Sequence, residues 1–156
     1  MKIKLSTKDI SLLALVSALY VALSLILSPI SFGIIQFRLS EVLVLLCFYK
    51  KKFSISLVLG CFITNLFSPF GLDIILGTLH TLVSVIFICL SKKLFVASLW
   101  PALFSFIIAY ELYLYGEPFI ISFIGVFLSE LIVVTFLGFP FFLQLEKNKH
   151  FQKFIN

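Results

Sequence analysis

Gln36-Phe37-Arg38-Leu39-Ser40-Glu41 is the stretch on which the interpretation of this chain depends, because it places charged side chains among segments apolar enough to cross a bilayer. It contains the only arginine of the sequence. Arg38 and Glu41 are three residues apart, so they share one face of a helix. Charged groups at a membrane boundary are costly unless they are paired, hydrated or used, which makes this stretch a candidate functional site.

The composition predicts an all-α integral membrane protein. Of the 156 residues, 62% are hydrophobic and 12% are charged, whereas a soluble domain is about half apolar and about a quarter charged. A span needs roughly 20 residues, so residues 1–156 have room for five or six crossings in a single membrane domain. The first apolar segment is too long for a signal-peptide core and lacks a small-residue cleavage site, so we expect it to remain as a helix.

Proline- and glycine-containing turns alternate with lysine clusters and divide the chain into six helical segments. We expect these segments at residues 10–27, 36–49, 53–67, 72–90, 94–115 and 119–142, followed by a polar, basic tail. All eleven lysines fall within residues 2–8, 50–52, 92–93 and 147–153. With six crossings these four clusters lie on one side, and because positive residues favour the cytoplasm, both termini are predicted to be cytoplasmic. A five-crossing arrangement would scatter the lysines.

Several polar side chains recur within the apolar segments, and carboxylates in such a bundle rarely face lipid. We expect them to turn inward and to form an outward-opening pocket for a small polar molecule that carries positive charge or several N–H donors. The candidate binding residues are Gln36, Arg38, Glu41, Asn65, Asp73, Glu111 and Glu130.

Structural roles are the alternative for each candidate. Arg38 and Glu41 could neutralise each other at a helix start, and Asp73 could cap the fourth helix. Asn65 could hydrogen-bond a neighbouring helix. Glu111 and Glu130 could each pair with another side chain in a purely structural role. His80 is expected to be a packed, satisfied residue rather than a metal ligand.

The first segment carries a stripe of small residues, Ala14, Ala18 and Ala22, spaced by four. Such a stripe lets another helix approach closely in a membrane. The stripe could serve packing within this chain or docking of a second membrane subunit, and the spacing is compatible with both.

Most catalytic chemistry is unsupported by the sequence. It contains no GxxxxGK[ST], HExxH or GxSxG motif, and Cys47, Cys61 and Cys89 lack metal-ligand spacing and are expected to be packing residues. No cofactor or metal is expected, and without a polar domain a nucleic-acid partner is excluded. Transport or binding is therefore favoured over enzyme activity.

Two motifs resemble the QueT family. One is Ser28-Pro29-Ile30-Ser31-Phe32-Gly33 followed by residues 36–41, and the other is Asn65-Leu66-Phe67-Ser68-Pro69-Phe70-Gly71-Leu72-Asp73 with Gly77-Thr78 after it. The match continues in order through Glu111-Leu112, Glu117-Pro118-Phe119, Gly125 and Glu130-Leu131-Ile132-Val133-Val134.

The resemblance implies a six-helix substrate-binding S component of an energy-coupling factor (ECF) importer in the bacterial cytoplasmic membrane. Its implied partners are a transmembrane coupling protein and two ATPases, and its implied ligand is 7-aminomethyl-7-deazaguanine or the 7-cyano relative. In S components an AxxxA stripe on the first helix commonly meets the coupling protein, which favours docking for the alanines. One carboxylate would accept the N–H and amino groups of the base side by side, and a second would hold the aminomethyl cation.

Two other functions remain open. The chain could be an S component for another small vitamin-like molecule, which ligand identity would decide. It could also be a stand-alone secondary carrier, which inverted repeats would favour, although the sequence shows none.

Overall fold

The computed structural model describes residues 6–31 and 36–155, which form helices joined by short turns with no β-strand among them. The expectations for Lys2 and Lys4 and for the Phe32-Gly33 part of the first break lie outside the described residues. Helix α1 (Thr7–Ile26) begins with a capping box, in which Ser6 Oγ accepts from the Asp9 backbone N–H at 3.2 Å and Asp9 Oδ2 accepts from the Ser6 N–H at 3.1 Å. These bonds satisfy backbone donors that the first turn of a helix leaves free.

The remaining elements follow one another closely along the chain. They are α2 (Ser28–Ser31), η1 (Leu39–Leu45), α3 (Leu46–Tyr49), α4 (Phe53–Asn65), η2 (Gly71–Ile74), α5 (Leu76–Leu90), α6 (Leu94–Leu103), α7 (Phe106–Leu114), α8 (Phe119–Glu130), η3 (Leu131–Gly138), α9 (Phe139–Glu146) and α10 (Lys149–Ile155). Elements η1 and η2 are 3₁₀ helices and η3 is π-helical.

Four helical stretches are long and apolar enough to cross a membrane: Thr7–Ile26, Gly71–Leu90, Leu94–Leu114 and Phe119–Glu146. Two apolar helices are shorter, Leu39–Tyr49 and Phe53–Asn65. All six coincide with predicted segments, although the last runs four residues further than expected. The structure therefore confirms an all-helical, membrane-type architecture.

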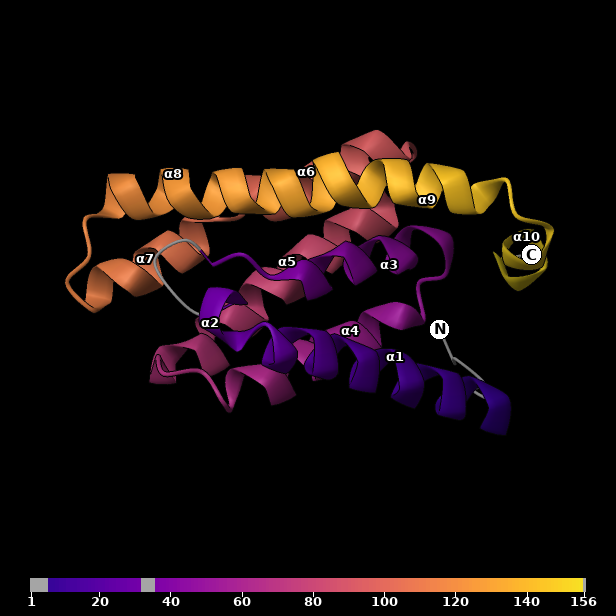
Figure 1. The fold of residues 1–156 in the computed structure, drawn as a ribbon, viewed down its shortest axis with the longest axis horizontal. Coiled ribbons are helices and arrows are strands. Elements are labelled where there is room, and N and C mark those ends of the chain that lie inside the picture. Colours follow the sequence, from indigo (N-terminus) through magenta and orange to yellow (C-terminus); the bar gives the residue numbers. More distant parts are fainter. Residues whose placement is uncertain (1–5, 32–35, 156) are drawn as a thin grey trace.

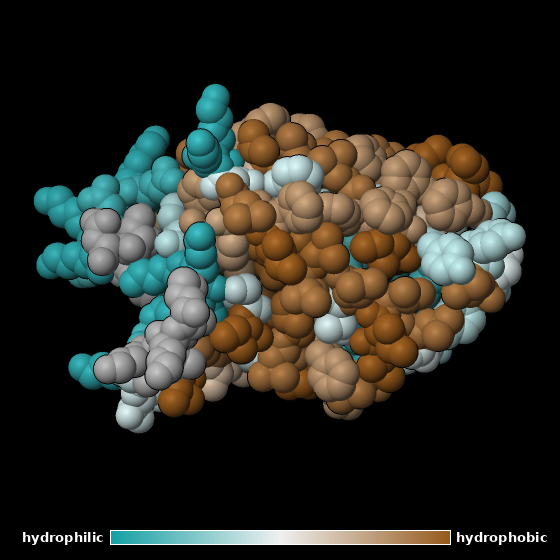
Figure 2. All heavy atoms as spheres, turned by 180° about the vertical axis from the view of Figure 1, so that it is seen from behind, coloured by the Kyte–Doolittle hydropathy of each residue, from teal (hydrophilic) through white to brown (hydrophobic). Residues whose placement is uncertain are grey.

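The long helices lie roughly side by side in an elongated bundle, with α1 along one side and the continuous rod α8–η3–α9 along the other (Figure 1). The start of α1 and helix α10 lie at the same end of this bundle (Figure 1). Figure 2 shows hydrophilic side chains gathered at one end and hydrophobic side chains over most of the remaining surface. An apolar belt with one charged end is the surface expected of a protein embedded in a bilayer.

Small residues let α1 and α4 approach closely. A Cβ added at Gly60 would lie 3.1 Å from Tyr20 Cβ and 3.2 Å from the Ser17 carbonyl oxygen. Ser17 and Tyr20 face inward, whereas Leu15 and Ile26 on the opposite face are 66% and 77% exposed. Helix α1 thus buries its polar side chains within the bundle and leaves large apolar side chains exposed, as expected of a helix that faces lipid.

Two features differ from the expectations. The fifth segment is interrupted at Phe104–Ser105, between α6 and α7, after Pro101 has removed one backbone donor from α6. The polar, basic tail, for which the sequence predicts no helix, contains α10, and its Phe151 contacts Tyr49 edge-on at 5.3 Å between ring centroids. Phe151 also lies 6.3 Å from Phe142 between ring centroids, and Gln152 Nε2 donates to the Glu146 carbonyl oxygen at 2.9 Å, so α10 packs against the end of α9.

Candidate functional site

All seven candidate binding residues are buried, and none is more than 4% exposed: Gln36, Arg38, Glu41, Asn65, Asp73, Glu111 and Glu130. They come from five separate parts of the chain, namely the stretch from Gln36 through η1, the end of α4, η2, α7 and the end of α8. We call these seven side chains the polar cluster. Their burial confirms that they turn away from lipid, and their role in binding remains a prediction.

Arg38 and Asp73 form a buried ion pair. Arg38 Nη2 donates to Asp73 Oδ2 at 2.7 Å, and Arg38 Nε donates to the Ser31 carbonyl oxygen at 3.3 Å. Neither η2 nor α5 has a side-chain cap hydrogen bond, so the alternative in which Asp73 caps the fourth helix is wrong. Arg38 forms its ion pair with Asp73. The other alternative, in which Arg38 and Glu41 neutralise each other, is therefore not what this contact shows.

Glu41 is held by neutral donors from two other helices. Its Oε1 accepts from the Tyr20 hydroxyl of α1 and, at 3.3 Å, from Thr81 Oγ1 of α5. Tyr20 is completely buried and was missed as a site residue in the sequence. The signal that could have identified it is its position on the same face of α1 as Ser17 and Ser24, where a tyrosine needs a hydrogen-bond partner.

Asn65 connects the end of α4 to η2. Its Nδ2 donates to the Asp73 carbonyl oxygen at 2.8 Å and to Thr78 Oγ1 at 3.3 Å, which confirms the expectation of a hydrogen bond to a neighbouring element. Gly77 leaves the necessary room, because a Cβ there would overlap Asp73 Oδ1 and lie 2.8 Å from Asn65 Nδ2. His80 is likewise satisfied within the bundle, with Nε2 2.9 Å from the Pro101 carbonyl oxygen.

Many polar atoms of the polar cluster are buried without a hydrogen-bond partner among the described residues. They are Gln36 Nε2, Glu41 Oε2, Asn65 Oδ1, Asp73 Oδ1, both carboxylate oxygens of Glu111, and Glu130 Oε2. Leaving such an atom unsatisfied costs about 1–3 kcal/mol, and more for a charged group. The set contains six acceptor oxygens and one donor nitrogen, so it is complementary to a molecule rich in N–H groups.

The polar cluster has two halves that share Arg38. Glu111 lies one helical turn before Tyr115, whose hydroxyl accepts from the Leu72 N–H beside Asp73 at 3.0 Å, and it interacts electrostatically with Asp73 and Arg38. Glu130 interacts electrostatically with Glu41 and Arg38. Ser129 Oγ joins Gln36 to the second half by donating to the Gln36 carbonyl oxygen at 3.3 Å. Carboxyl groups from four different elements therefore interact with a single guanidinium, and a cationic ligand would add a second positive charge to this cluster.

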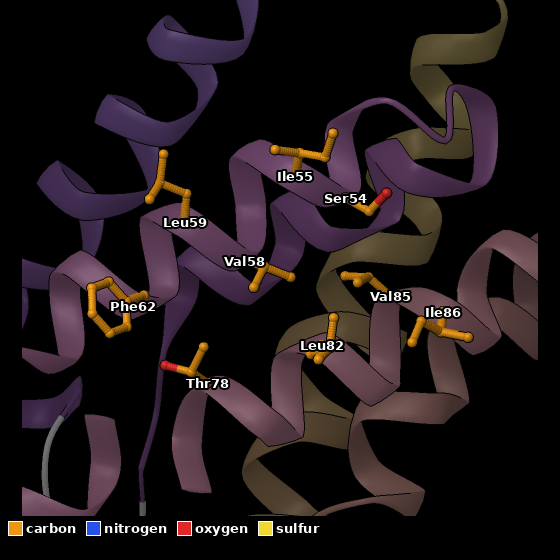
Figure 3. A pocket seen from close by; sticks show the side chains of 9 residues that line it. All are labelled: Ser54, Ile55, Val58, Leu59, Phe62, Thr78, Leu82, Val85 and Ile86. Atoms are coloured by element: carbon orange, nitrogen blue, oxygen red, sulfur yellow. The ribbon is translucent and has the colours of Figure 1, made fainter. Parts of the chain in front are cut away.

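Other parts of the described structure are weaker candidates for a binding site. A groove of about 520 Å³ lies between α4 and α5 (Figure 3), but its walls are almost entirely apolar and belong to the outward surface of the bundle. Within residues 6–31 and 36–155, no group of three or more His, Cys, Asp or Glu side chains is arranged to hold a metal ion. Cys47 and Cys61 are buried and Cys89 is half-buried, all three as free thiols.

Comparison with known proteins gives the family directly. The family model described as QueT transporter matches residues 10–147. The chain belongs to the QueT transporter family. This QueT chain is also 48% identical over 82 residues to the queuosine precursor transporter QueT of Lactococcus lactis subsp. cremoris (strain MG1363). That stretch covers 51% of this chain and 48% of the relative, so the match spans about half the length of each. No solved structure matches the chain.

Membership of a transporter family agrees with the expectation that the chain is not an enzyme. The family match extends from α1 to the end of α9, so it includes every element that contributes to the polar cluster. The sequence resemblance stated above is thereby confirmed at the level of the family.

Proposed function

We propose that this QueT chain is the substrate-capture subunit, or S component, of an ECF-type ABC importer for a queuosine precursor. The ligand is 7-aminomethyl-7-deazaguanine or 7-cyano-7-deazaguanine. A transmembrane coupling protein and two ATPase subunits supply the energy, since the sequence has no ATP-binding motif of its own.

The observation that carries this proposal is the set of unpartnered, mostly acceptor atoms in the polar cluster. A deazaguanine presents several N–H groups along its edge, and a carboxylate accepts two of them side by side in a strong, charge-assisted contact. A site with these buried acceptors would reject bases without the matching donors, because its own groups would remain unsatisfied. The name of the relative from Lactococcus lactis agrees with a ligand of this class.

Six membrane crossings with both termini in the cytoplasm account for the distribution of charge. The four long apolar stretches and the two shorter helices supply the six crossings. Lysines follow α3, α5 and α9 and precede α1, so they alternate with the turns on the opposite side. We place the lysine-rich end in the cytoplasm of a bacterial cell, in accordance with the positive-inside rule.

The alanine stripe of α1 is the proposed docking surface for the coupling protein. Ala14, Ala18 and Ala22 are all exposed, whereas Ser17 and Ser24 on the other face of the same helix are buried. Packing within this chain therefore does not account for the stripe. Small exposed side chains on a membrane helix allow close approach of another helix.

Calorimetry on the purified protein in detergent tests the ligand assignment. We expect tight binding of 7-aminomethyl-7-deazaguanine, much weaker binding of guanine, which lacks the aminomethyl group, no binding of thiamine at the same concentrations, and weaker binding of the precursor after Glu41→Gln. Folded protein that binds neither deazaguanine would overturn the assignment, and tight binding of thiamine would indicate an S component for another vitamin-like molecule.

A further inference from the structure

The two halves of the polar cluster differ in what they lack, and this difference bears on which precursor is bound. In the half around Glu111, the unpartnered atoms are both Glu111 oxygens, Asp73 Oδ1 and Asn65 Oδ1. All of them are acceptors. In the half around Glu130, the unpartnered acceptors Glu41 Oε2 and Glu130 Oε2 are accompanied by a donor, Gln36 Nε2.

An acceptor-only half is suited to a group that only donates. An alkylammonium group carries three N–H donors and no acceptor, and several carboxylate and amide oxygens satisfy all of them. A nitrile has the opposite character, because its nitrogen can only accept. Placed against Glu111, a nitrile would leave the buried oxygens unsatisfied and would face negative charge.

The electrostatics of the half around Glu111 also favour a cationic group. Arg38 Nη2 is paired with Asp73 Oδ2 at 2.7 Å, whereas neither carboxyl oxygen of Glu111 has a hydrogen-bond partner among the described residues. Glu111 is fully buried and both of its oxygens are unpartnered. A ligand cation would strongly stabilise the carboxylate form of a buried group in that state.

The mixed half fits the edge of the base. Gln36 Nε2 can donate to the carbonyl oxygen of a deazaguanine, while Glu130 Oε2 and Glu41 Oε2 can accept from its ring N–H and amino groups. Gln36 and Glu130 are connected through Ser129, whose hydroxyl donates to the Gln36 carbonyl oxygen. This half therefore recognises what the amine and nitrile precursors have in common.

We infer that Glu111, together with Asp73 and Asn65, binds the ammonium of an aminomethyl substituent and makes the protein selective for the amine precursor over the nitrile precursor. The inference rests on the proposed function and adds to it the identity of the ligand and the residue that selects it. Glu111 acts on the substituent, whereas Glu130 acts on the base.

Competition calorimetry with both precursors on each variant tests this division. For the wild-type chain we expect the dissociation constant of the amine to be about 100-fold or more below that of the nitrile, as for other buried, hydrogen-bonded charge pairs. Glu111→Gln should weaken amine binding by a similar factor and change nitrile binding less than about threefold. Glu130→Gln should weaken the binding of both precursors by comparable factors.

The ratio of the two constants is the decisive quantity, because it does not depend on the fraction of protein that is folded. Equal affinities in the wild type, or a ratio unchanged by Glu111→Gln, would overturn the inference while leaving the proposed function intact. A collapse of the ratio in Glu130→Gln with no effect in Glu111→Gln would also overturn it. Failure of the wild type to bind either precursor would instead overturn the proposed function.

Discussion

Arg38 and Asp73 are 35 residues apart in the sequence and form an ion pair of 2.7 Å, with Arg38 only 4% exposed and Asp73 fully buried. The pair joins the start of η1 to η2, the two 3₁₀ elements that enter the polar cluster. Removing one member of a buried pair leaves an uncompensated charge and costs about 3–5 kcal/mol. Arg38→Met should therefore lower the free energy of unfolding by about that amount, as followed in detergent by the fluorescence of Trp100.

The double substitution Arg38→Met with Asp73→Leu should recover most of this loss, because replacing both charges by apolar groups is often nearly neutral. Lys52→Met is the matched control. It removes the cation of the half-exposed Lys52–Asp9 pair at the charged end, where about 0–1 kcal/mol is at stake. Equal losses for Arg38→Met and Lys52→Met would contradict a structural role for the buried pair.

Tyr20 and Glu41 give a second test of the polar cluster. The Tyr20 hydroxyl donates to Glu41 Oε1 in the buried centre of the bundle, and a hydrogen bond to a charged group contributes about 1.5–3 kcal/mol. We expect Tyr20→Phe to lower the free energy of unfolding by about that much. Tyr110→Phe, at a tyrosine that is 51% exposed, should change it by less than about 0.5 kcal/mol.

Periodicity and charge were sufficient to predict the helical segments and the burial of the seven candidate residues. Polar residues recur at helical spacing in the apolar segments, and in a bundle surrounded by lipid such residues favour the interior. Asn65 was also interpreted correctly, because an amide at the end of an apolar helix needs a nearby acceptor.

The pairings could not be predicted in the same way. Arg38 precedes η1 with an extended backbone and Asp73 lies in η2, so their ion pair depends on how two segments 35 residues apart come together. The break at Phe104–Ser105 and the return of α10 onto Tyr49 depend on contacts between distant segments. Tyr20 was missed because its partner lies 21 residues away.

Gly77 tests how closely the polar cluster is packed. A Cβ at this position would overlap Asp73 Oδ1 and approach Asn65 Nδ2 to 2.8 Å, so Gly77→Ala should displace both side chains at a cost of about 1–3 kcal/mol. We expect weaker binding of the amine precursor in calorimetry together with a lower unfolding midpoint. Gly71→Ala is the control, since its Cβ would find only the Tyr115 hydroxyl, at 3.8 Å. A normal affinity in Gly77→Ala would show that the ligand does not depend on this arrangement.

Ala18 separates ligand capture from transport. It is exposed in the middle of the alanine stripe, so Ala18→Phe should leave binding in detergent unchanged while preventing close approach of the coupling protein. Uptake of labelled precursor by cells that contain the whole transporter should fall at least about tenfold. Val96→Phe adds bulk at a 40% exposed position of α6 and should transport normally. Normal uptake by Ala18→Phe would place the docking surface elsewhere.

The predicted orientation in the membrane, with both termini in the cytoplasm, can be tested by cysteine labelling. Lys51 lies between α3 and α4 at the charged end, and Glu117 lies in the turn between α7 and α8. With six crossings and both termini inside, a membrane-impermeant maleimide applied to intact cells should label Glu117→Cys and should label Lys51→Cys only after the cells are permeabilised. The parent chain sets the background from its three native thiols. Labelling of Lys51→Cys in intact cells with protection of Glu117→Cys would invert the topology, which would place the lysine-rich end outside against the positive-inside rule.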